Sequence, residues 1–230
     1  MKKKTAKQLK ALDLMRDEFK EVDYPDKGQE NVTFALDDYT FVKYLRAREW
    51  DFNRAKKILY ENVEWRKRYR PHELTYDSPG IVREVTTMGE SKSGHIVLSY
   101  KIATYNPSRY TVEDYVRSRV CECEMVKRDM AREGWLVDKY IMVADMKGFS
   151  VLKHPTPHSL RMVKQLMNMT QSLYRDSVER IIIYQYPVIF QTFWPLIKIW
   201  IKPATAKRIL FLTDAKKLLE FMELDQIFEE

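Results

Sequence analysis

Few residues in this sequence have the types and spacing that catalysis or metal binding requires. Cys121 and Cys123 form a C-x-C pair without a second pair, and helical spacing would turn their thiols to different faces. We therefore expect two reduced thiols rather than a zinc site or a disulfide. His154 and His158 lie four residues apart, but the two prolines of "HPTPH" disfavour a metal site between them.

Asp145 follows an apolar run, which is a position where α/β enzymes often place a catalytic carboxylate. No base or nucleophile can be nominated beside it, so we interpret "ADMKG" as a turn at the end of a strand. The chain has only six glycines, and it lacks the glycine-rich phosphate-binding motifs, the G-x-S-x-G elbow and H-E-x-x-H. The sequence therefore predicts no catalytic residue, no metal and no cofactor, and the protein is not expected to be an enzyme.

The segment from Pro187 to Ile201 is the most unusual stretch of the chain because it has almost no polar face. We expect a helix that begins with Thr192 as its N-cap, has Pro195 in its first turn and runs to about Lys202. Such a helix is either buried on all sides or covers something apolar, such as a lipid or a membrane. An ordinary core helix is the alternative that the residues alone leave open.

The overall charge is consistent with a polyanionic partner. The chain has 230 residues and a formal net charge of +7, which suits either nucleic acid or an anionic membrane surface. No recognised nucleic-acid motif is present, so no nucleic-acid partner is predicted. No run of about 18 apolar residues is present to span a bilayer, and the basic N-terminus lacks the apolar core of a signal peptide. A cytoplasmic protein is expected.

The first part of the chain is predicted to be entirely helical. Residues 5–22 form one amphipathic pattern, a second helix includes Phe41 and Leu45, and a third begins near Asn53 as its N-cap and ends before Pro71. A Pro- and Gly-bearing link at 71–94 follows. We place a domain boundary here, with an N-terminal helical module at 1–75 and a second domain at 76–230.

The second domain alternates short apolar runs with helical patterns. The runs at 95–102, 139–146, 180–186 and 208–213 predict strands, and the helices between them begin near Thr111 and Pro157. Strands that alternate with helices of this length are typical of βαβ units and a mostly parallel sheet. The predicted fold class is therefore α/β.

Three blocks of the sequence resemble the CRAL-TRIO family. They are "FVKYLRAREWDFNRAKKILYENVEWRKRY", "VADMKGFS" and "YRDSVERIIIYQYPVIFQTFWPLIKIWIKPATAKRILFL", and they span residues 41–213 in the family's order. The chain is most similar to the family's yeast-type phosphatidylinositol/phosphatidylcholine transfer proteins. The resemblance implies a hydrophobic lipid cavity over the sheet, closed by a mobile gate helix at 190–202.

The resemblance also implies the site residues. The side chains expected around the acyl chains belong to the sheet and the gate: Val143, Ile181, Ile183, Phe190, Phe193, Trp194, Ile197, Trp200, Ile201 and Leu210. The headgroup residues would be Arg48, Asp176, Thr205 and Arg208. The chain departs from the family pattern at Glu49, which reverses a charge, and at Tyr140 and Met142, which replace small hydroxyl residues that bind phosphatidylcholine.

We therefore expect a cytoplasmic, peripherally membrane-associated protein that transfers one phospholipid, with phosphatidylinositol favoured over phosphatidylcholine. Its partners would be the phospholipid and an anionic membrane, and it is expected to be a monomer. Two alternatives remain: a carrier of another hydrophobic ligand, such as a sterol-like molecule, a retinoid or haem, and a protein-binding scaffold with a vestigial pocket.

Overall fold

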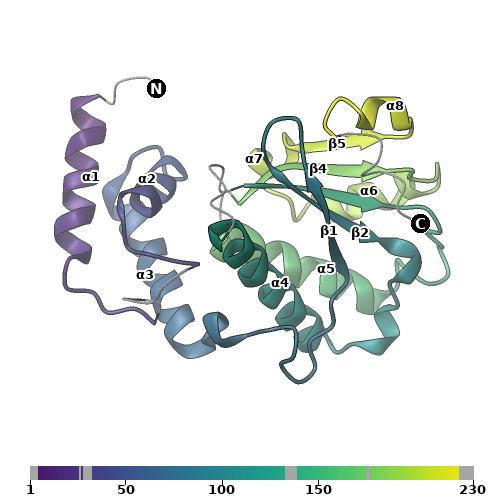
Figure 1. The fold of residues 1–230 in the computed structure, drawn as a ribbon, viewed down its shortest axis with the longest axis horizontal. Coiled ribbons are helices and arrows are strands. Elements are labelled where there is room, and N and C mark those ends of the chain that lie inside the picture. Colours follow the sequence, from purple (N-terminus) through teal and green to yellow (C-terminus); the bar gives the residue numbers. More distant parts are fainter. Residues whose placement is uncertain (1–4, 26, 28–32, 133–138, 175–176, 223–230) are drawn as a thin grey trace. The chain divides into compact units, whose positions relative to one another are not determined.

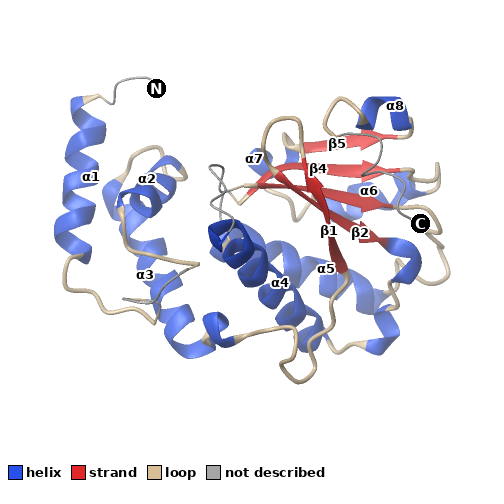
Figure 2. Cartoon of the chain, in the orientation of Figure 1, coloured by secondary structure: helices blue, strands red, loops and turns tan. Residues whose placement is uncertain are grey.

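The computed structural model of the protein describes residues 5–25, 27, 33–132, 139–174 and 177–222. The chain forms two compact units, Met1–Leu74 and Thr75–Glu230. Figure 2 shows that the strands described in the structure all belong to the second unit. The fold is therefore mixed α/β, as the alternation of strands and helices predicts.

The first unit consists of helices packed around their own apolar core. They are α1 (Ala6–Phe19), α2 (Asp38–Arg46), α3 (Phe52–Tyr69) and a short 3₁₀ turn, Pro71–Glu73. The three helices bury Leu12, Leu45 and Leu59. The cap of α3 differs from the prediction: the carboxylate of Asp51 accepts a hydrogen bond from the Arg54 N–H, and Asn53 lies inside the helix.

The second unit contains one five-stranded sheet in the order β1-β2-β3-β4-β5 (Figure 1). Strands β2 to β5 are parallel, and β1 pairs with β2 in the antiparallel direction. The strands are β1 (Val85–Glu90), β2 (Ile96–Lys101), β3 (Tyr140–Asp145), β4 (Val178–Tyr184) and β5 (Ile209–Leu212). The helical elements are α4 (Val112–Arg132), α5 (Pro157–Leu173), α6 (Phe190–Lys198), α7 (Pro203–Ala206), α8 (Ala215–Leu218) and the 3₁₀ turns Ile102–Thr104 and Pro107–Arg109.

The four predicted strands are present, and β1 is an addition within the predicted link. Its sequence, "VTTMGE", has one buried residue at its start and mostly exposed or half-buried residues after it. An edge strand needs only one neighbour, so it does not require the continuous apolar run that marks a buried parallel strand.

Each face of the sheet has its own set of buried side chains. On one face, Val97, Ile141 and Ile182 pack against Leu218 and Met222, which lie in and after α8. On the other face, the side chains point toward α4, α5 and α6. This second face carries the candidate site.

The apolar segment folds as a shorter helix than predicted. Helix α6 begins at Phe190, so Thr192 lies inside it, where its hydroxyl donates a hydrogen bond to the carbonyl of Ile189 (2.7 Å). The helix ends at Lys198, and α7 begins at Pro203. Within the residues that the structure describes, no helix is both long and apolar enough to span a bilayer.

Candidate ligand-binding cavity

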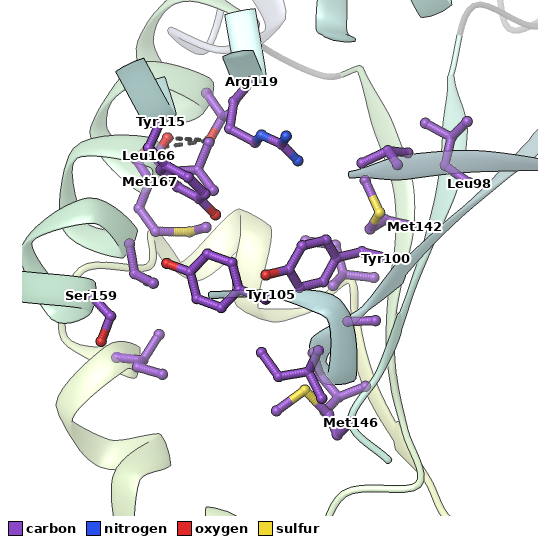
Figure 3. Close-up of a pocket in the computed structure, with 18 of the residues that line it drawn as sticks. Leu98, Tyr100, Tyr105, Tyr115, Arg119, Met142, Met146, Ser159, Leu166 and Met167 are labelled. Carbon is purple, nitrogen blue, oxygen red and sulfur yellow. Dashed lines mark hydrogen bonds between the residues drawn. The ribbon is translucent and has the colours of Figure 1, made fainter. Parts of the chain in front are cut away.

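A cavity of about 330 Å³ lies between the sheet and helices α4, α5 and α6 (Figure 3). The floor is made by alternate residues of the strands, because successive side chains in a strand point to opposite faces. From β3 these are Tyr140, Met142 and Ala144, and from β4 they are Ile181 and Ile183. The size is near the lower end of about 300–1,000 Å³ that is typical of small-molecule sites.

The wall opposite the floor comes mainly from α5. Its inward residues include Leu160, Val163, Leu166 and Met167, which follow helical spacing along one side. Thr156 caps this helix by accepting a hydrogen bond from the Ser159 N–H. The cap and the apolar stripe together explain why this segment forms a helix with one face on the cavity.

Helix α6 closes a further side of the cavity with aromatic and aliphatic side chains. Phe190 is buried, and Phe193 and Ile197 are half-buried and also line the cavity. The outward positions Leu196 and Ile199 are exposed. The segment is therefore apolar on both sides, with only one side covered by protein.

Two predicted cavity residues, Val143 and Leu210, lie on the opposite face of the sheet. Val143 belongs to the cluster beneath α8, and Leu210 pairs in register with Ile182, which belongs to the same cluster. The reason is the alternation of the strands: Ile181 and Ile183 face the cavity, so the residues in register with Ile182 face away. These two positions were assigned to the wrong face.

Three other predicted residues lie beside the cavity without lining it. Trp194 packs edge-on against Phe211, with ring centroids 4.9 Å apart. The side chains of Trp200 and Ile201 are half-buried at the end of the α6 segment. Of the predicted set, Ile181, Ile183, Phe190, Phe193 and Ile197 line the cavity, and their contact with a ligand stays a prediction.

The predicted headgroup residues belong to different parts of the chain. Arg208 donates a hydrogen bond from Nη1 to the carbonyl of Val178 (2.5 Å), at the start of β4. Thr205 is half-buried in α7, three residues before it. Arg48 belongs to the first unit, where Nη1 donates to the carbonyl of Ala47, and Asp176 lies outside the described residues. Their role in headgroup binding stays a prediction.

The residues considered for chemistry have structural partners. Asp145 Oδ1 accepts a hydrogen bond from the Lys147 N–H, which closes the turn after β3. The Nδ1 atom of His154 accepts from the Ser150 N–H, and Nε2 of His158 donates to the carbonyl of Tyr110. The described residues contain no group of three His, Cys, Asp or Glu side chains that could hold a metal ion.

The two cysteines lie on α4 as free thiols, and Cys123 lines the cavity. Burial raises the pKa of Cys123 to about 12 and that of Cys121 to about 11. Both groups are therefore protonated at neutral pH and are poor nucleophiles.

A polar group in the α4 wall was missed from the sequence. Arg119 and Glu122 are both buried and line the cavity, and their Nη1 and Oε2 atoms are 2.7 Å apart. The backbone N–H groups of Glu84 and Val85 donate to the other oxygen of Glu122. A signal was available: Arg119 follows Tyr115 by four residues on the apolar side of the predicted helix, where a charge is unusual.

Burial raises the pKa of Glu122 to about 7, against the opposing effect of Arg119. The folded protein therefore holds this proton more tightly than the unfolded chain does. It follows that the free energy of unfolding decreases as pH rises from about 4.5 to about 7, by an amount on the order of 3 kcal/mol. We expect Glu122→Gln to lack this decrease in urea unfolding measured across that range. Glu113→Gln, an exposed change on the same helix, should keep it, and a wild-type slope in Glu122→Gln would contradict the assignment.

Comparisons with known proteins cover nearly the whole chain. A family profile described as "CRAL/TRIO domain" matches residues 84–230, and one described as "CRAL/TRIO, N-terminal domain" matches residues 11–61. The solved structure titled "Crystal structure of Sfh5" superposes with a TM-score of 0.77 at 19% sequence identity, over 96% of this chain and 85% of that chain. This likeness supports the fold.

Two curated relatives are similar in sequence. The chain is 25% identical over 245 residues to the phosphatidylinositol transfer protein CSR1 of Eremothecium gossypii. The matched region covers 98% of this chain and 54% of that protein. It is 26% identical over 200 residues to the SEC14 cytosolic factor of Kluyveromyces lactis. This matched region covers 77% of this chain and 64% of that protein. The matched regions are thus less than two thirds of these relatives' own length.

Proposed function

Because the chain belongs to the CRAL-TRIO family, we propose that it binds a single lipid in the cavity and transfers or presents it between membranes. The observation that carries the proposal is the cavity itself, which has an apolar floor and is closed on one side by α6. Phosphatidylinositol is the favoured cargo, since one relative is named a phosphatidylinositol transfer protein. A cytoplasmic location is part of the proposal and accords with the name of the other relative.

Lipid entry requires α6 to move. A phospholipid with two long acyl chains is larger than the space of about 330 Å³ beneath the helix. Displacement of α6 would enlarge that space, because Phe190, Phe193 and Ile197 form one of its walls. A smaller hydrophobic ligand, such as a sterol-like molecule, would fit with less displacement and is the second candidate cargo.

One side chain holds the C-terminal end of the gate segment. Gln171 on α5 donates from Nε2 to the carbonyl of Trp200 (2.9 Å), and its Oε1 accepts from the Lys202 N–H (2.7 Å). We expect Gln171→Leu to remove both bonds and raise the rate of lipid release about tenfold, measured as transfer between vesicles. The exposed neighbour substitution Lys164→Leu serves as the control on the same helix. An unchanged release rate in Gln171→Leu would contradict this role.

The outer side of α6 is suited to contact with a membrane. Val188, Ile199 and Leu152 are 81%, 76% and 88% exposed. The loop that carries Leu152 lies beside α6, since the ring centroid of Phe149 is 5.5 Å from that of Phe190 and 6.2 Å from that of Phe193. Exposed lysines next to this apolar surface, including Lys153 and Lys198, would favour anionic headgroups. Peripheral contact with an anionic membrane is thus part of the proposal.

The proposed headgroup assignment is tested at Arg208. We expect Arg208→Glu to lower the transfer of phosphatidylinositol at least tenfold, because the reversed charge repels the phosphate, and to change sterol transfer little. Arg208→Lys keeps the charge and should retain most of the activity. The assay uses vesicles with labelled phosphatidylinositol, phosphatidylcholine or a fluorescent sterol. Equal losses for all cargoes in Arg208→Glu would remove the headgroup assignment, and no transfer of any cargo by the wild type would remove the function.

A further inference from the structure

The wall of the cavity that comes from α4 contains a charged group within otherwise apolar surroundings. Arg119 and Glu122 line the cavity, and only 6% and 5% of their surfaces are exposed. Figure 3 shows the guanidinium of Arg119 pointing into the space between Tyr115 and Met142. A buried charge of this kind is costly unless all of its hydrogen-bonding groups have partners.

The guanidinium is only partly satisfied by the protein. Its Nη1 pairs with Glu122, and its Nη2 donates to the carbonyl of Val82 (3.1 Å) and lies 3.5 Å from an oxygen of Glu84. The Nε–H is buried and has no hydrogen-bond partner among the described residues. An unsatisfied donor in such a place is destabilising, so an acceptor from a ligand would be stabilising.

Two tyrosine hydroxyls in the lining of the same cavity are also available. Tyr100 and Tyr115 line the cavity, and neither hydroxyl makes a hydrogen bond within the described part of the chain. Arg119 lies over the ring of Tyr115, 5.4 Å from its centroid. Burial raises the pKa of both hydroxyls, so they stay protonated and can donate. By contrast, the hydroxyl of Tyr110 is already used, since it donates to Glu84 (2.6 Å).

The charges of the cluster restrict what it could accept. Two carboxylates, Glu84 and Glu122, surround one guanidinium, and the side chains of Glu84 and Arg119 are each 7% exposed. A phosphate or carboxylate placed here would add a negative charge to a buried site that already contains two carboxyl groups. An uncharged oxygen can accept from Arg119 Nε without that repulsion.

We propose that Arg119, Tyr100 and Tyr115 form a subsite inside the cavity for an uncharged oxygen of the cargo, bound through the Arg119 Nε–H. The oxygen is either the ester carbonyl of a glycerolipid or the hydroxyl of a sterol-like lipid, which share this chemistry. The inference rests on the proposed lipid binding and adds a selectivity to it: the cavity recognises an oxygen in the buried part of its ligand as well as a headgroup.

Two matched pairs of probes test the subsite by direct binding to the full chain. One pair is phosphatidylinositol with ester-linked chains and its ether-linked analogue, which has no carbonyl. The other is a fluorescent sterol and its deoxy analogue, which has no hydroxyl oxygen to accept a hydrogen bond. We expect the wild type to prefer the first member of one pair by about tenfold or more, and that pair identifies the source of the oxygen.

Substitutions in the subsite test whether it causes the preference for the first member of a probe pair. Arg119→Lys keeps the charge between Glu84 and Glu122 but removes the Nε donor, so the preference should fall to about twofold or less. The double variant Tyr100→Phe, Tyr115→Phe should also reduce the preference. It replaces Arg119→Lys as the test if that variant does not fold. Thr104→Val is the control, because that hydroxyl is exposed, lies outside the cavity lining and donates to the carbonyl of Lys101 (2.9 Å).

Three results would overturn the proposal: equal affinity for both members of each pair in the wild type, a full preference retained in the folded Arg119→Lys variant, or a full preference retained in the double tyrosine variant. Equal, tight binding of all probes would leave the lipid-binding function intact and remove only the subsite. Binding of none of them would remove the proposed function and the subsite together.

Discussion

Replacement of Ala144 by tryptophan is expected to abolish lipid binding while leaving the protein folded. Ala144 is a small residue in the floor of the cavity, in register with Tyr100 on one side and Ile183 on the other. All three line the same space. An indole ring at this position would project into the cavity and occupy the volume that the acyl chains need. Because it enters open space, the strain that usually accompanies overpacking of a core should be small.

The expected loss is at least 100-fold in affinity for labelled phosphatidylinositol, measured by titration of the purified variant. Circular dichroism and thermal unfolding should show a folded protein with a melting temperature close to that of the wild type. Ala144→Ser keeps the side chain small and is the matched control, with binding close to that of the wild type. Tight binding by a folded Ala144→Trp variant would place the lipid elsewhere on the protein.

The second large effect is expected on membrane binding. Leu152→Ser, Val188→Ser and Ile199→Ser together remove the most exposed apolar side chains beside α6 without changing the net charge. If each side chain contributes about 1 kcal/mol when it inserts, the triple variant loses about 3 kcal/mol, which is about 100-fold in affinity for anionic vesicles. Vesicle flotation or sedimentation measures this directly.

The control for this experiment is a second triple substitution at exposed apolar residues that belong to other segments of the chain. Leu9→Ser, Leu14→Ser and Val82→Ser remove side chains that are 49%, 39% and 39% exposed. This set should change vesicle binding by less than about threefold. If both triple variants lose affinity equally, insertion beside α6 is not what holds the protein on the membrane.

The fold was predictable because its strands and helices have strong local patterns. The run Ile181–Ile183 is apolar at every position, which marks a strand buried on both faces, and Thr111 caps α4 as expected by accepting from the Asp114 N–H (3.0 Å). Strand β1 was missed because only one of its residues is buried. An edge strand is stabilised by its pairing with β2, which a local pattern does not record.

The site was only partly predictable for a related reason. In a strand with apolar residues on both sides, the sequence does not say which alternate set faces the ligand. Val143 and Leu210 were therefore assigned to the cavity, although they lie on the opposite face of the sheet. The polar group formed by Arg119 and Glu122 also includes Glu84, which is distant from them in sequence. Glu84 comes close to Arg119 only because β1 pairs with the sheet. Such a contact could not be seen before the topology was known.

The most direct test of the central claim, that the space under α6 holds a lipid, is native mass spectrometry of the purified protein. We predict a mass above that of the 230-residue chain by one lipid molecule, identified after organic extraction, and its absence from the Ala144→Trp variant. A folded wild-type protein at the mass of the bare chain, with no lipid in the extract and no uptake from vesicles, would contradict the account and favour a protein-binding role.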